Sequence, residues 1–114
     1  MLEIVRDRTW EQYHTFYDSP GVPSDLSDYT FVCQIRKSTA VRNADGIFVC
    51  PLVVDVEVVV TDSNVVAWSL TRSQTAALSP TEKYHIDMVG TKNGVDEAFI
   101  NPEPIKVVNR PSVP

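Results

Sequence analysis

The sequence predicts an all-β domain, on three observations. Apolar residues recur at every second position in several runs, whereas the spacing of an amphipathic helix is almost absent. Pro, Gly, Asn and Asp interrupt these runs about every ten residues. The length of 114 residues, with 43% hydrophobic and 22% charged residues, suits a single ordinary domain. We expect one antiparallel β-sandwich over residues 1–108, followed by a proline-containing C-terminal tail at 109–114.

The first half of the chain supplies the opening strands. The first is predicted at 9–17, ended by an Asp-Ser-Pro-Gly turn, and its alternation places four residues on one side: Trp10, Gln12, His14 and Phe16. A second strand is predicted at 29–36, and the polar segment 37–46 is expected to be an exposed loop. An extended pattern resumes at 47–50, where Pro51 predicts an edge position or a bulge. A valine-rich strand follows at 53–60.

The second half contains the only helical signal. After a turn at 62–64, a strand at 65–70 points Val66, Trp68 and Leu70 one way. Residues 71–78 favour a short helical turn that begins at Thr71 and ends before Ser79-Pro80, with Leu78 packed on the sandwich. A strand at 84–90 and its return at 95–100 flank Asn93-Gly94, the strongest hairpin signal in the chain. A break at 101–104 precedes a short last strand at 105–108.

Charge and cysteine content exclude several classes of protein. The net charge of -5 has the wrong sign for neutralising nucleic-acid phosphates, and no run approaches the roughly 20 apolar residues of a membrane span. The N-terminus carries acids among its bases and no apolar core, so we expect synthesis in a cytoplasm without secretion. Cys33 and Cys50 lie within strand-like runs, which favours buried free thiols over a disulfide.

No catalytic, cofactor-binding or metal-binding site is predicted. His85 and Asp87 share one strand face, which suits half of a metal site or a base with its orienting acid. The favoured interpretation is a solvated strand face without either function. His14 is predicted as a hydrogen-bonded, partly buried histidine. Asp55 and Glu57 are predicted on an exposed ridge and not as the carboxylate pair of a glycosidase.

Two features predict contacts with other subunits. Val53 and Val59 lie opposite the apolar row at 54–60, so this strand offers more apolar surface than one small sandwich buries. The prolines at the C-terminus suit either a frayed end or an arm that docks along a neighbour with little entropy to lose.

The order of these signals resembles a known family. The signals are Trp10 and Phe16, the segment Asp18–Tyr29, the strand end Ile35-Arg36, the strand Val65–Thr71 with Thr75–Leu78, and Tyr84–Asp87. In this order they are similar to the immunoglobulin-like β-sandwich at the N-terminus of phage baseplate upper proteins and in small tail- or neck-associated proteins. The resemblance extends from Trp10 to Val108. Glu82-Lys83 stands where the family usually has a glycine before the tyrosine strand. Residues 101–104 stand where it has a glycine before the last strand, and this second difference implies a stiffer C-terminal end.

This resemblance implies a non-enzymatic structural protein of a bacteriophage particle, an adaptor in the tail, baseplate or neck that holds other virion proteins such as fibres. Its expected partners are those proteins and further copies of itself in a symmetric ring or cluster, with no cofactor, nucleic acid or membrane. A capsid decoration protein is an alternative in the same class. A carbohydrate-binding module would use aromatic platforms at Trp10, Tyr13, Tyr17 or Trp68, and a metal-dependent hydrolase would be built around His85 and Asp87.

Overall fold

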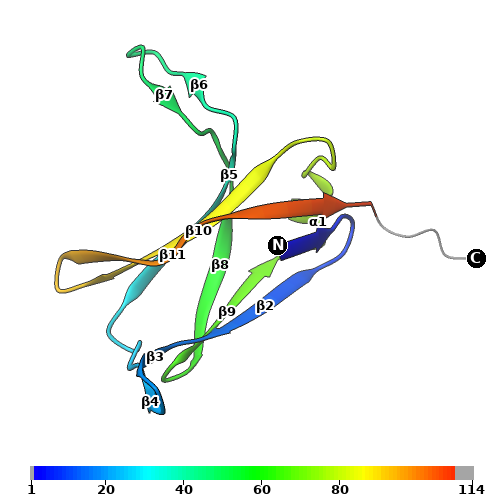
Figure 1. Ribbon diagram of the computed structural model, residues 1–114. Helices are drawn as coiled ribbons and strands as arrows, with labels where there is room; N and C mark the ends of the chain where they lie inside the picture. Colours follow the sequence, from blue (N-terminus) through cyan, green and yellow to red (C-terminus); the bar gives the residue numbers. More distant parts are fainter. Residues whose placement is uncertain (1, 110–114) are drawn as a thin grey trace, which may run out of the picture.

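The computed structural model describes residues 2–109, and its strands confirm the all-β prediction (Figure 1). These residues form twelve elements: β1 (Leu2–Val5), β2 (Trp10–Thr15), β3 (Tyr17–Ser19), β4 (Val22–Pro23), β5 (Thr30–Lys37), β6 (Val41–Arg42), β7 (Phe48–Val49), β8 (Leu52–Asp62), β9 (Val65–Leu70), α1 (Arg72–Ala76), β10 (Tyr84–Lys92) and β11 (Val95–Val108). The predicted C-terminal tail from residue 110 onward lies outside the described residues.

Seven strands form one nearly closed sheet in the order β1-β11-β10-β5-β8-β9-β2. Strand β8 joins its two halves, because residues 52–56 pair with β5 while residues 57–62 pair with β9. The sheet therefore turns back on itself along β8 and encloses its inward face. All pairings within it are antiparallel except that of β1 with β11.

The core lies between the two halves of this sheet. Trp68 is fully buried near its centre, and its indole N–H donates to the Met88 Sδ at 3.2 Å. The Trp10 ring lies 6.3 Å from the Trp68 ring. The alternation predicted for the strands at 65–70 and 84–90 is confirmed. The residues predicted to share one side of each strand are all buried: Val66, Trp68, Leu70, Tyr84, Ile86 and Met88.

The predicted short helix is confirmed as α1, which lies at one end of the core. The Thr71 side chain accepts from the Gln74 backbone N–H, and the Gln74 side chain accepts from the Thr71 N–H, which is a capping box. Thr75 is buried, and its hydroxyl donates to the Arg8 carbonyl at 2.7 Å. Leu78 is 1% exposed. A five-residue helix is too short to be stable alone, so these tertiary contacts hold it in place.

Four aromatic rings fill the opposite end. Phe99 contacts three of them edge to face, with centroid distances of 5.4 Å to Phe16, 5.0 Å to Tyr29 and 5.1 Å to Phe31. These rings come from β5, from β11 and from the residue that follows β2. Their packing therefore connects the middle strand β5 with β11 and with the end of edge strand β2. Gly90 on β10 lies beneath Phe31 and Phe99, and its lack of a side chain leaves room for both rings.

Several boundaries differ from the prediction. The opening strand is β1 and not the run at 9–17, which itself divides into β2 and β3. The predicted loop at 37–46 contributes to a small hairpin of β6 and β7. The predicted break at 101–104 is wrong, because these residues continue β11, with one register shift against β10 between Ile100 and Glu103. Prolines are tolerated there because β1 covers only residues 105–108, so the rest of β11 is an edge.

The Asn93-Gly94 turn is confirmed as a tight hairpin. Both residues have positive φ, 53° and 76°, and Lys92 pairs directly with Val95. This is the backbone conformation that an Asn-Gly pair favours.

The bulge predicted near Pro51 is also found, as a register shift between β5 and β8 opposite residues 52–54.

Replacing Gly90 with Ala is expected to lower the free energy of unfolding by about 1–3 kcal/mol, the range for overpacking a core. A Cβ at this position would lie 2.9 Å from the Phe31 ring and nearer still to Phe99. Urea unfolding measures the loss. In the double variant Gly90→Ala/Phe99→Leu the smaller side chain makes room, so its loss should be less than the sum of the two single losses. Additive losses would contradict the contact.

Candidate functional site

The histidine and carboxylate that the sequence places on one strand face lie on the outer face of β10. His85 and Asp87 are both half-buried, and the His85 Nδ1 is 3.4 Å from the Ser38 hydroxyl. Among residues 2–109, no cluster of three or more His, Cys, Asp or Glu side chains could hold a metal ion. The two residues therefore share a strand face as expected, without further ligands around them.

The predicted acidic ridge on β8 is exposed. Asp55 accepts a hydrogen bond from the Gln34 amide at 3.0 Å, and Gln34 in turn accepts from the Arg36 guanidinium at 2.8 Å. Glu57 is exposed near Ser69. These side chains form a polar outer surface across β5 and β8.

Both cysteines are free thiols. Cys33 is buried as predicted, and burial raises the pKa of its thiol well above the usual value, which disfavours the reactive thiolate. Cys50 is only half-buried, contrary to the prediction, and its Sγ lies 3.8 Å from the Ser38 carbonyl oxygen.

His14 is half-buried on β2, but the predicted hydrogen bond is missing. Its ring packs against Trp68 with centroids 4.1 Å apart, and its Nε2 is buried without a hydrogen-bond partner. Burial lowers the pKa of His14 below 6.5, opposed in part by the charge of Glu103 on β11.

The aromatic platforms of the carbohydrate-binding alternative are only partly available. Trp10 and Trp68 are 9% and 0% exposed, so neither can stack on a sugar ring. Their positions in alternating strands place them on the inward face. Tyr13 and Tyr17 remain exposed on the outside.

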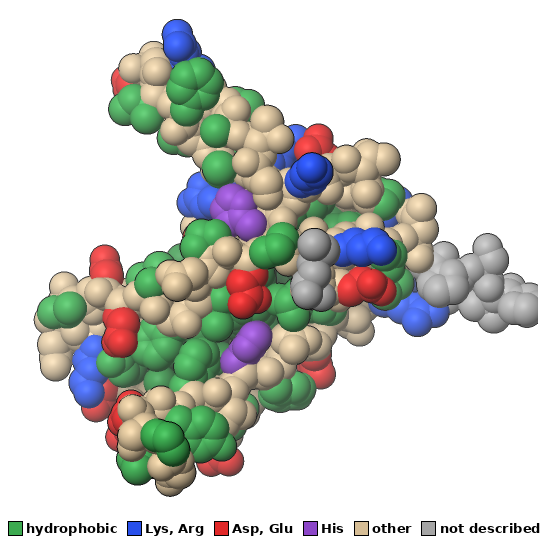
Figure 2. Space-filling model, viewed as in Figure 1, with side chains coloured by type: hydrophobic (Ala, Val, Ile, Leu, Met, Phe, Trp, Pro, Cys, Tyr) green, Lys and Arg blue, Asp and Glu red, His purple; other side chains and the backbone are tan. Residues whose placement is uncertain are grey.

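The most conspicuous surface feature is a projecting hairpin, residues 38–51, here called the arm (Figure 1). It extends away from the sheet and carries hydrophobic side chains near its end (Figure 2). Phe48 is 64% exposed and Ile47 59%. The Arg42 guanidinium lies 5.1 Å from the centroid of the Phe48 ring. The sequence predicts only an exposed loop at 37–46, although Asn-Ala-Asp-Gly between apolar residues at 41 and 47–49 is a hairpin signal.

The arm has a well-formed tip. The Asn43 side-chain oxygen accepts from the backbone N–H groups of Asp45 and Ile47, both at 3.0 Å. Gly46 has φ +79°, which the turn requires. Only two residue pairs join β6 to β7, and a two-stranded hairpin in water is marginally stable. The arm is therefore an ordered hairpin whose apolar side chains remain largely exposed among residues 2–109.

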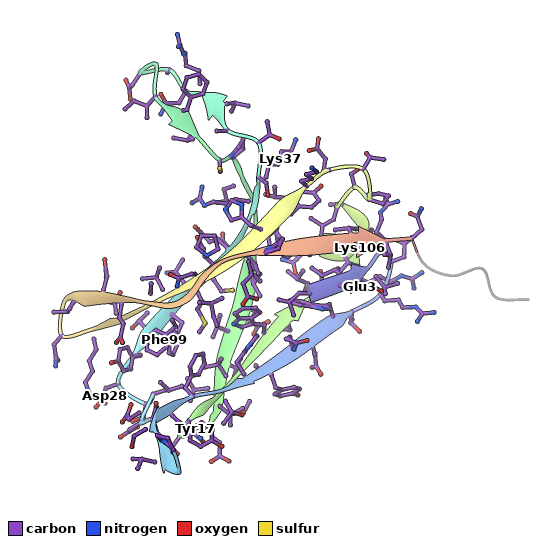
Figure 3. The ribbon with its side chains drawn as sticks, in the orientation of Figure 1. Glu3, Tyr17, Asp28, Lys37, Phe99 and Lys106 are labelled. Carbon is purple, nitrogen blue, oxygen red and sulfur yellow. The ribbon has the colours of Figure 1, made fainter. Side chains whose placement is uncertain are left out.

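A hollow of about 370 Å³ lies at the aromatic end of the sheet and is here called the mouth. Its lining comprises Phe16, Tyr17, Asp18, Ser24, Asp25, Leu26, Tyr29, Lys92, Glu97, Ala98 and Phe99. Phe99 and Tyr17 are labelled around it in Figure 3, and Figure 2 shows the same face hollowed, with hydrophobic side chains on its floor. Three carboxylates and one ammonium line it, so its net charge is negative.

Hydrogen bonds and a cation–ring contact fix the polar side chains of the mouth in place. The Tyr29 hydroxyl donates to Glu97 at 3.1 Å, and the Lys92 ammonium lies 5.5 Å from the Tyr29 ring centroid. Asp25 accepts from the Ser27 hydroxyl at 2.6 Å, and this bond lowers the pKa of Asp25, so its carboxylate stays charged. Asp18 accepts from the Ser24 hydroxyl at 2.9 Å. The mouth thus presents fixed negative charge beside aromatic rings.

No family model and no curated protein sequence matches this chain. Within residues 2–109, no helix is long and apolar enough to cross a membrane.

His14 is expected to make stability depend on pH. Its folded pKa lies below the unfolded value of 6.5, so below that pH the unfolded chain binds a proton that the folded chain resists. The free energy of unfolding contributed by His14 therefore falls as pH drops below 6.5. Urea unfolding of wild type and His14→Phe from about pH 7.5 to 5.5 measures this, and the variant should gain relative to wild type at the acidic end. A difference that stays constant with pH would contradict it.

Arm and mouth aromatics should differ sharply in their effect on folding. Phe48→Ala is expected to change the free energy of unfolding by less than about 0.5 kcal/mol, because this side chain is 64% exposed. Phe99→Ala removes three ring contacts and should cost at least about 2 kcal/mol. Urea unfolding of both variants decides the matter, and a comparable loss in the two would show that the arm packs against the body.

Proposed function

We propose that this protein is a non-enzymatic structural component of a bacteriophage particle, an adaptor in the tail, baseplate or neck that holds other virion proteins. The supporting observation is the arm, which places apolar side chains in solvent on an element that contributes little to the core. Exposed apolar side chains gathered on a projection are typical of protein interaction sites. The proposal takes its location in a phage from the sequence resemblance.

The sheet architecture is compatible with this role. We propose that the nearly closed sheet is an immunoglobulin-like sandwich, with the β1-β11-β10-β5 half facing the β9-β2 half and β8 passing between them. Such a scaffold displays loops and edge strands from a rigid core. Here it displays the arm, the mouth and the free edge of β11.

A capsid decoration protein is the second candidate within the same class. It would use the same surfaces on a head shell, and the acidic net charge of -5 suits a site on the outside of a particle. The carbohydrate-binding alternative is weakened, since only Tyr13 and Tyr17 of its four aromatic platforms are exposed.

Mass spectrometry of purified virions tests the proposal. The chain should be present in intact particles at a stoichiometry above one copy, as expected for a component of a symmetric assembly. Dissociating heads from tails before measurement separates the adaptor from the decoration protein, because the first follows the tail fraction and the second the head fraction. Absence from both fractions would contradict the virion role.

A further inference from the structure

We propose that the arm of one copy docks into the mouth of a second copy, so that the protein associates head to tail. This inference rests on the proposed function and names one partner for it. Two surfaces of the same chain carry it: a projecting hairpin with an uncovered cation and aromatic ring, and a hollow whose carboxylates surround aromatic rings.

The chemistry of the two surfaces is complementary. Phe48 and Arg42 lie together on the arm, with the guanidinium over the ring. Asp18, Asp25 and Glu97 line the mouth beside the rings of its floor. A guanidinium forms charge-assisted hydrogen bonds with carboxylates, and aromatic and arginine side chains are the usual anchors of protein interfaces.

The mouth already accepts a cation of its own chain. Lys92 lies over the face of Tyr29, whose hydroxyl is held by Glu97. Because Lys92 already lies over the Tyr29 ring, an incoming Arg42 would meet the carboxylates of Asp18 and Asp25 beside it. Asp45 at the arm tip would bring an acid toward Lys92. Both signs of charge on the arm therefore have a counterpart in the mouth.

The contact must join different copies. The mouth includes Tyr29, directly before β5, whereas the arm begins directly after Lys37 at the end of β5. Eight residues of extended strand span about 26 Å, so the two surfaces lie at opposite ends of that strand (Figure 1). Joining the arm of one copy to the mouth of the next uses two different surfaces, and such a contact closes into a ring where the rotation permits.

Sedimentation velocity of the purified chain over a range of concentrations tests this contact. Wild type should form oligomers, and both the arm variant Phe48→Ala and the mouth variant Glu97→Lys should weaken association at least about tenfold, the effect expected for an interface anchor. Asp25→Lys provides a second mouth variant. Matched controls are Tyr13→Ala, another exposed aromatic, and Glu57→Lys, another exposed carboxylate, and both should assemble as wild type does.

Mixing the two deficient variants gives the most specific result. A Phe48→Ala copy keeps an intact mouth and a Glu97→Lys copy keeps an intact arm, so one contact can form between them and no more. The mixture should yield a one-to-one pair. Larger assemblies, or no pair, would overturn the head-to-tail arrangement.

Other outcomes separate this inference from the virion role. A wild type that stays monomeric at every concentration, or a Phe48→Ala variant that assembles normally, overturns docking between copies. An arm that binds a different virion protein in place of a second copy also overturns it. In each case, presence of the chain in intact particles would leave the virion role standing, and its absence from particles would contradict that role alone.

Discussion

The structure depends on covering the apolar inward face of one seven-stranded sheet. Alternation along each strand concentrates large side chains on that face, with Trp68 at its centre, and leaving it in water would cost about 25 cal/mol for each Å² of apolar surface. The sheet covers itself by turning back along β8. Helix α1 closes one end, and the rings around Phe99 fill the other.

This solution leaves some surfaces uncovered, and those are the candidates for function. The sheet does not close completely, so β1, β2 and most of β11 remain edges. The arm leaves the end of β5 and carries apolar side chains into solvent, while the ring-filled end opens as an acidic hollow. The arm contributes little to the core, whereas the mouth is lined by rings that also pack on it, so both expose surface that is free to contact other molecules.

The sequence predicts the parts of the fold that local chemistry determines. The hairpin at Asn93-Gly94 follows from two residues that tolerate positive φ, and the helix follows from the cap at Thr71. Non-local elements left weaker signals. Strand β1 has four residues and owes its existence to pairing with β11, about a hundred residues away in the chain. The continuation of β11 through Pro102 and Pro104 likewise depends on its position at an edge, which no local pattern reveals. The mouth is assembled from segments between Phe16 and Phe99 and could not be predicted from any one of them.

We infer that the arm and the mouth are both covered when the protein does its work. Hydrogen–deuterium exchange, compared between the dissociated chain and the assembled state, tests it most directly. Amides of the arm, where only two residue pairs hold the strands together, should exchange rapidly in the free chain and become protected on assembly, together with amides around residues 24–29 and 95–99. Arm amides that exchange equally fast in both states would contradict the claim.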